Sequence, residues 1–147
     1  MKNLQELPSW LQPEAPLGSA VRHVAGLSGR FDWVGIYVLQ RDTLVLGPYI
    51  GAKPVHTRIR VGMGVCGTAV LEEKDQNVPD VRERANYLAC GLETRSELVC
   101  LIRDQKGRIV GQIDVDSHQA GAFGETEELA VRQVADELGY YWPKNPL

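Results

Sequence analysis

The chain has 147 residues, which is enough for one domain with its own hydrophobic core. Hydrophobic residues make up 44% of it and charged residues 24%, a normal globular composition that excludes wholesale disorder. Its 16 basic and 19 acidic residues give a formal net charge of −3, without the basic excess of a nucleic-acid-binding protein. No apolar run reaches the roughly 18 residues of a membrane span, and the first residues hold no apolar signal core. We therefore expect a cytoplasmic protein that binds neither nucleic acid nor membrane.

Hydrophobic periodicity and turn residues predict the elements in chain order. The patterns indicate a helix over 17–28, strands over 31–39, 43–51 and 56–61, a short helix over 67–73, an edge strand over 76–81, a loop over 85–95, strands over 96–104 and 108–117, and a helix over 124–142. The expected apolar face of the last helix consists of Leu129, Val131, Val134, Ala135 and Leu138.

This order of elements predicts an α+β fold with one antiparallel sheet. The N- and C-terminal helices are expected to pack on one face, while the middle segment covers the other face and a ligand pocket. We divide the chain into an N-terminal extension (1–16), one domain (17–142) and a C-terminal tail (143–147). Because the terminal helices are expected to expose much apolar surface, we also expect a homodimer.

The three cysteines are Cys66, Cys90 and Cys100, an odd number that argues against a disulfide scaffold. There is no CxxC pair and the histidines lack metal-ligand spacing, so we expect no metal and no cofactor. Cys100 lies within the apolar run SELVCLI and is interpreted as a small buried core residue. Cys66 and Cys90 each stand beside a glycine at a predicted turn, where a thiol can reach a ligand.

Acidic residues interrupt two predicted core strands. Glu97 opens the run ELVCLI, and Asp114 and Asp116 close the run IVGQIDVD. Because residues two apart in a strand share a face, the two aspartates point the same way, and a hairpin would bring Glu97 across from them. Like charges this close raise at least one pKa, so the cluster could hold an ammonium group and donate a proton. A polar strand end and a divalent-metal site are the alternatives.

Two aromatic residues, Trp33 and Tyr37, share one face of the first predicted strand. They could form the wall of an apolar pocket for a small side chain. The alternative is that they are ordinary core or interface aromatics.

Several segments together resemble a known family. The segments are GMGVCGTAV (62–70), VPDV (78–81), YLAC (87–90), SELV (96–99) and GQIDVDS (111–117), and they are similar to those of the free methionine-(R)-sulfoxide reductases. Members of this family are single-domain enzymes with the GAF fold, and the resemblance runs over roughly residues 17–140. It implies reduction of free methionine (R)-sulfoxide to methionine, with thioredoxin as the reductant.

The resemblance also implies roles for particular residues. Cys90 matches the attacking cysteine of the family. Glu97, Asp114 and Asp116 match the groups that bind the substrate amine and assist the sulfoxide, and Trp33 and Tyr37 match the lining of its methyl end.

One position departs from the family pattern. Typical members carry a resolving cysteine ten residues before the GVCG cysteine, where this chain has His56. Cys66 is then the remaining candidate to resolve a sulfenic acid on Cys90, through a Cys66–Cys90 disulfide. The departure leaves an alternative open, in which the chain is a non-catalytic GAF module that binds a small ligand or senses oxidation.

Overall fold

The computed structural model describes residues 6–84 and 93–147. The helices in this part of the chain are α1 (Pro16–Ala25), α2 (Gly64–Glu72), α3 (Glu125–Tyr140) and a 3-10 turn, η1 (Val81–Glu83). The strands are β1 (Trp33–Gln40), β2 (Thr43–Ile50), β3 (Arg58–Arg60), β4 (Gln76–Val78), β5 (Ser96–Arg103) and β6 (Ile109–Ser117).

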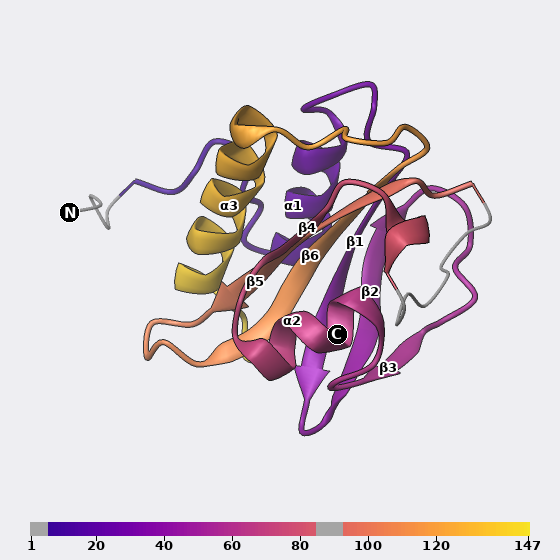
Figure 1. Ribbon diagram of the computed structural model, residues 1–147. Helices are drawn as coiled ribbons and strands as arrows, with labels where there is room; N and C mark the ends of the chain where they lie inside the picture. The colour runs from indigo at the N-terminus through magenta and orange to yellow at the C-terminus, as the bar shows by residue number, and fades with distance from the viewer. Residues whose placement is uncertain (1–5, 85–92) are drawn as a thin grey trace.

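The strands form one six-stranded antiparallel sheet in the order β3-β2-β1-β6-β5-β4. Helices α1 and α3 lie side by side on one face of this sheet, and α2 covers the other face (Figure 1). The predicted α+β architecture, with the terminal helices on one face and the middle segment on the other, is confirmed. The two faces therefore have separate hydrophobic cores.

Alternation along β1 divides its side chains between the two cores. Val34, Ile36 and Val38 pack under α1 and α3, whereas Trp33 and Tyr37 face the α2 side. Both sets are buried, as expected for a central strand covered on both faces. The α2 face thus receives the aromatic residues that the sequence placed together.

The terminal helices bury their apolar stripes more completely than expected. Val131, Val134 and Leu138 of α3 are at most 3% exposed, but Leu129 is 61% exposed, so its assignment to the apolar face was wrong. Leu129 precedes Val131 by two residues. This separation corresponds to a rotation of about 200° around the helix axis, so the two side chains point to nearly opposite sides of α3. Because no other large hydrophobic residue of α1 or α3 is exposed, the expected apolar dimer surface is not present on these helices. Dimerisation stays a prediction.

A glycine lets the first turn of α2 pack closely against the end of β3. The helix begins at Gly64, three residues earlier than predicted. A Cβ on Gly67 would lie 2.5 Å from the carbonyl oxygen of Arg60, so only glycine lets the first turn of the helix sit this close to the end of β3. The strand β4 ends at Val78 because Pro79 cannot donate a hydrogen bond to the ladder. No helix within residues 6–84 and 93–147 is long and apolar enough to span a bilayer.

Candidate active site

Three carboxylates meet on the α2 face of the sheet. Glu97 shares a face with Val99, whose side chain belongs to the α2-side core. The register pairs Glu97 with Asp116 and Val99 with Asp114, so the β5–β6 hairpin places all three acidic residues together. The predicted convergence is confirmed.

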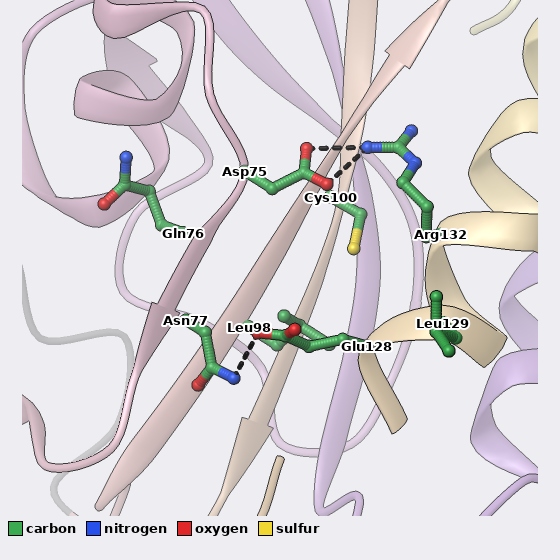
Figure 2. Close-up of a pocket in the computed structure, with 8 residues that line it drawn as sticks. All are labelled: Asp75, Gln76, Asn77, Leu98, Cys100, Glu128, Leu129 and Arg132. Atoms are coloured by element: carbon green, nitrogen blue, oxygen red, sulfur yellow. Dashed lines mark hydrogen bonds and ion pairs between the residues drawn. The ribbon is translucent and has the colours of Figure 1, made fainter. Parts of the chain in front are cut away.

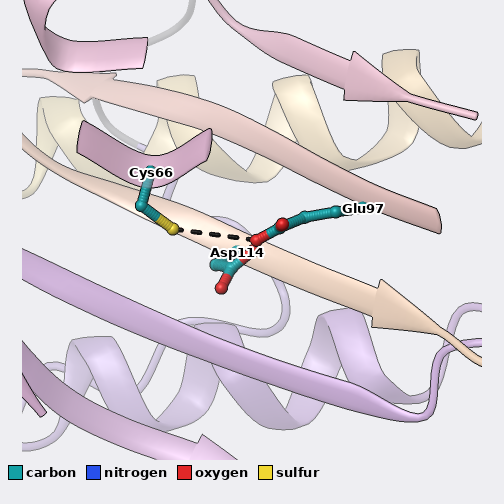
Figure 3. Close-up of side chains that lie close together, drawn as sticks. All are labelled: Cys66, Glu97 and Asp114. Atoms are coloured by element: carbon teal, nitrogen blue, oxygen red, sulfur yellow. Dashed lines mark hydrogen bonds between the residues drawn. The ribbon is translucent and has the colours of Figure 1, made fainter. Parts of the chain in front are cut away.

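A thiol from α2 completes the cluster. Cys66 Sγ lies 3.8 Å from Glu97 Oε2, and one donor atom each from Cys66, Glu97 and Asp114 all lie within 4.8 Å of one another (Figure 3). The side chain of Gln112 donates a hydrogen bond of 3.0 Å from Nε2 to the carbonyl oxygen of Cys66. Since Gln112 lies on β6, this bond fixes the first turn of α2 over the strand that carries Asp114.

The two aspartates are buried without the usual compensation. Asp114 is 0% and Asp116 3% exposed. Both carboxylate oxygens of Asp114 and one oxygen of Asp116 have no hydrogen-bond partner within the described part of the chain. A buried polar group without a partner costs free energy, so these oxygens are candidates to bind a ligand. Their burial favours the cluster over the alternative of a simple polar strand end, which stays open.

Burial also changes the protonation of these groups. It raises the pKa of Asp116 well above its usual range, and the neighbouring charge of Asp114 raises that pKa further. Burial likewise raises the pKa of Asp114, while the nearby Glu97 and Cys66 side chains offset part of that rise. The pair can therefore keep a proton that an exposed carboxyl would have lost.

An aromatic wall adjoins the acidic cluster. The ring centroids of Trp33 and Tyr37 lie 6.4 Å apart, and Tyr49 stacks on Trp33 at 5.7 Å. Trp33 pairs with Asp116 across β1 and β6, so one side of the wall borders the carboxylates. A Cβ on Gly35 would lie 2.2 Å from the Trp33 ring, so glycine at this position lets the ring lie across the strand. This arrangement offers an apolar surface beside buried acidic groups.

Tyr49 is the member of the wall that the sequence did not indicate. Simple alternation from Leu44 and Leu46 would place Tyr49 on the opposite face of β2. The pairing of β1 with β2 shifts by one residue between Gly35 and Tyr37, and this bulge brings Tyr49 into the α2-side core. The neighbouring Gly-Pro pair was the available signal for such an irregularity.

The remaining predicted residues have different outcomes. Cys100 is 1% exposed in the core under α1 and α3, and burial raises its pKa to about 12, so its assignment as a core residue is confirmed. His56 is half-buried, and its carbonyl oxygen accepts a 3.0 Å hydrogen bond from Tyr37 Oη. Cys90 lies outside the described residues. Val81 precedes this segment and Arg95 follows it, and the amide of Val81 donates a 2.8 Å hydrogen bond to the carbonyl oxygen of Arg95.

A pocket of about 170 Å³ lies on the opposite side of β5 and β6 from the acidic cluster, between the β4 edge and α3 (Figure 2). Its polar side chains are already paired within the wall. Arg132 Nη1 lies 2.5 Å from Asp75 Oδ2, and Asn77 Nδ2 lies 2.6 Å from Glu128 Oε1. Because these groups are engaged within the wall itself, the pocket has less to offer a polar ligand than the cluster around Cys66.

Comparison with known proteins defines the class. The family model for the GAF domain matches residues 17–141, and the chain is a GAF domain. It is 42% identical over 107 residues to the free methionine-R-sulfoxide reductase of Escherichia coli, an alignment that covers 73% of this chain and 64% of that protein. The chain thus spans slightly less than two thirds of that relative.

Two solved structures are similar over most of their length. A type II free methionine-R-sulfoxide reductase from Thermoplasma acidophilum has a TM-score of 0.82 and 35% identity, covering 86% of this chain and 89% of that one. The enzyme from Neisseria meningitidis in complex with its substrate has a TM-score of 0.82 and 32% identity, covering 89% of this chain and 78% of that one. The chain belongs to the free methionine-(R)-sulfoxide reductase family.

Proposed function

We propose that the chain reduces free L-methionine (R)-sulfoxide to L-methionine. The observation that carries this proposal is the buried cluster of Cys66, Glu97, Asp114 and Asp116 beside an aromatic wall. A free amino acid has an ammonium group that the carboxylates can bind and an apolar methyl end that the wall can contact. The relatives named above carry this activity in their names.

Cys90 is proposed as the nucleophile. Its thiolate attacks the sulfoxide sulfur and accepts the oxygen, which leaves methionine and a sulfenic acid on Cys90. One of the buried carboxyl groups supplies the proton to the sulfoxide oxygen, and the raised pKa of Asp116 suits it to this role. The bond between Val81 and Arg95 supports the proposal, because it ties both flanks of the segment with Cys90 to the end of the sheet where β5 begins, one residue before Glu97.

Cys66 is proposed as the resolving thiol in place of the cysteine that His56 replaces. Its sulfur displaces the hydroxyl of the sulfenic acid as water and forms a Cys66–Cys90 disulfide. A dithiol of the thioredoxin type, in the reducing cytoplasm, then returns both sulfurs to thiols by exchange. The position of Cys66 in the acidic cluster supports this role, since a thiol at the proposed substrate site lies close to where the sulfenic acid would form.

The test is to incubate the chain with racemic free methionine sulfoxide and dithiothreitol and to measure each epimer by chromatography. The proposal expects loss of the R epimer alone, abolished by Cys90→Ser. Cys66→Ser should complete one turnover but not cycle with thioredoxin, whereas Cys100→Ser is the matched control and should cycle normally. Binding of the sulfoxide without any methionine produced would instead identify a ligand-binding GAF module.

A further inference from the structure

The acidic cluster also has the donor set of a metal site. Cys66 Sγ, a Glu97 oxygen and an Asp114 oxygen lie within 4.8 Å of one another, and the sulfur lies 3.8 Å from Glu97 Oε2. In a tetrahedral zinc site with Zn–S of about 2.3 Å and Zn–O of about 2.0 Å, neighbouring sulfur and oxygen ligands are about 3.5 Å apart. The side chains therefore need only small rotations to meet around one ion.

The state of Asp114 is an independent observation that points to a ligand. It is 0% exposed, and neither of its carboxylate oxygens has a hydrogen-bond partner of ordinary geometry within the described residues; only Glu97 and Cys66, the other two donors of the site, act on it. Its side chain projects toward Cys66 and Glu97 (Figure 3). A divalent cation would satisfy these oxygens and neutralise the buried acidic charge in one step.

The donor types select the kind of metal. Magnesium and calcium prefer six or more oxygen ligands, whereas a thiolate among carboxylates suits zinc. The three ligands come from α2, β5 and β6, and the Gln112 bond to the Cys66 carbonyl holds the helix over the sheet. Such a preformed site needs little reorganisation on binding.

We propose that the reduced protein binds one Zn²⁺ per chain through Cys66 Sγ, one Glu97 oxygen and one Asp114 oxygen, with a fourth position open to water. The thiol proton is released to solvent on binding. Zinc then occupies the place proposed for the substrate ammonium and ties up the resolving thiol, so it inhibits turnover reversibly. This last consequence rests on the proposed function, but the binding itself does not.

The test is competition for Zn²⁺ between the reduced full chain and a chromogenic chelator, followed by X-ray absorption at the zinc edge. We expect one ion per chain and one sulfur ligand at about 2.3 Å. Asp114→Asn and Glu97→Gln should each weaken binding more than about tenfold, because each removes an anionic ligand. Cys66→Ser should remove the sulfur ligand, and Cys100→Ser, which changes a buried thiol on the other face, should leave binding unchanged.

Two results would overturn the proposal. One is the absence of stoichiometric zinc on the folded, reduced wild type. The other is a sulfur ligand that survives in Cys66→Ser, because another cysteine then holds the ion. Circular dichroism of each variant separates loss of a ligand from loss of the fold. Zinc binding is measured without substrate. The metal site can therefore be confirmed or rejected even if the protein has no reductase activity.

Discussion

Glu97 and Asp116 lie directly opposite each other on neighbouring antiparallel strands, and each is only 3% exposed. Two charged carboxylates in such a cross-strand pair would destabilise a sheet, so the fold has to keep a proton on one of them. Asp114 adds a third acidic group on the same face, also buried. The fold therefore gives up stability at the place where the proposed substrate binds, as is common at functional sites.

Asp116→Asn should consequently stabilise the protein while it impairs the reaction. At neutral pH the folded protein has to keep the buried Asp116 protonated, a free-energy cost that the amide does not carry, so the free energy of unfolding should rise by about 1 kcal/mol. Reduction of the sulfoxide should fall strongly, because the variant loses its proposed proton donor. Urea denaturation and steady-state kinetics measure the two effects. Asp136 is exposed, so Asp136→Asn is the control and should change the free energy of unfolding and the rate of reduction only slightly. An Asp116→Asn protein that is less stable than the wild type would contradict the prediction.

Stability should fall as pH rises above the acidic range. The folded protein keeps a proton on Asp116 that the unfolded chain has released, since the pKa is raised on folding. The loss should begin near pH 4, the ordinary value for aspartate, and continue until the raised pKa is passed, at up to about 1.4 kcal/mol per pH unit for each proton. Denaturation midpoints across this interval should slope less steeply in Asp116→Asn. Equal slopes in the two proteins would count against it.

Gly35→Ala should disturb the aromatic wall. The new methyl group would lie 2.2 Å from the Trp33 ring, so the ring has to move away from its place beside Asp116. We expect a destabilisation of about 1–3 kcal/mol and a KM increase of about tenfold or more. Gly29→Ala is the matched control, because a Cβ there meets nothing within 4 Å. An unchanged KM in a folded Gly35→Ala protein would show that Trp33 does not contact the substrate.

Cys100 should resist alkylation in the native protein. With a pKa of about 12 it is almost entirely protonated at pH 8, and it is 1% exposed. Iodoacetamide followed by peptide mass spectrometry should find it unlabelled until guanidinium unfolds the chain. Rapid native labelling of Cys100 would mean that the core under α1 and α3 opens readily.

The sequence indicated the faces of β1, β5 and β6 correctly because side-chain direction in a regular strand is a local property with a period of two. Glu97, Asp114 and Asp116 could be placed on one face for that reason, and Cys100 could be placed in a core. The apolar face of the last helix was predicted less accurately, because Leu129 is exposed whereas Val131 and Val134 are buried.

Local patterns in the sequence were enough to predict the element order, the α+β class, the family resemblance and the shared face of the three carboxylates. They did not predict that Cys66, 31 residues from Glu97 in the chain, lies 3.8 Å from it, or that Tyr49 joins Trp33 through a one-residue bulge. These two relationships depend on how α2 packs against the sheet and on the register in which β2 pairs with β1. Such long-range packing fixes distances and burial, which local periodicity does not encode.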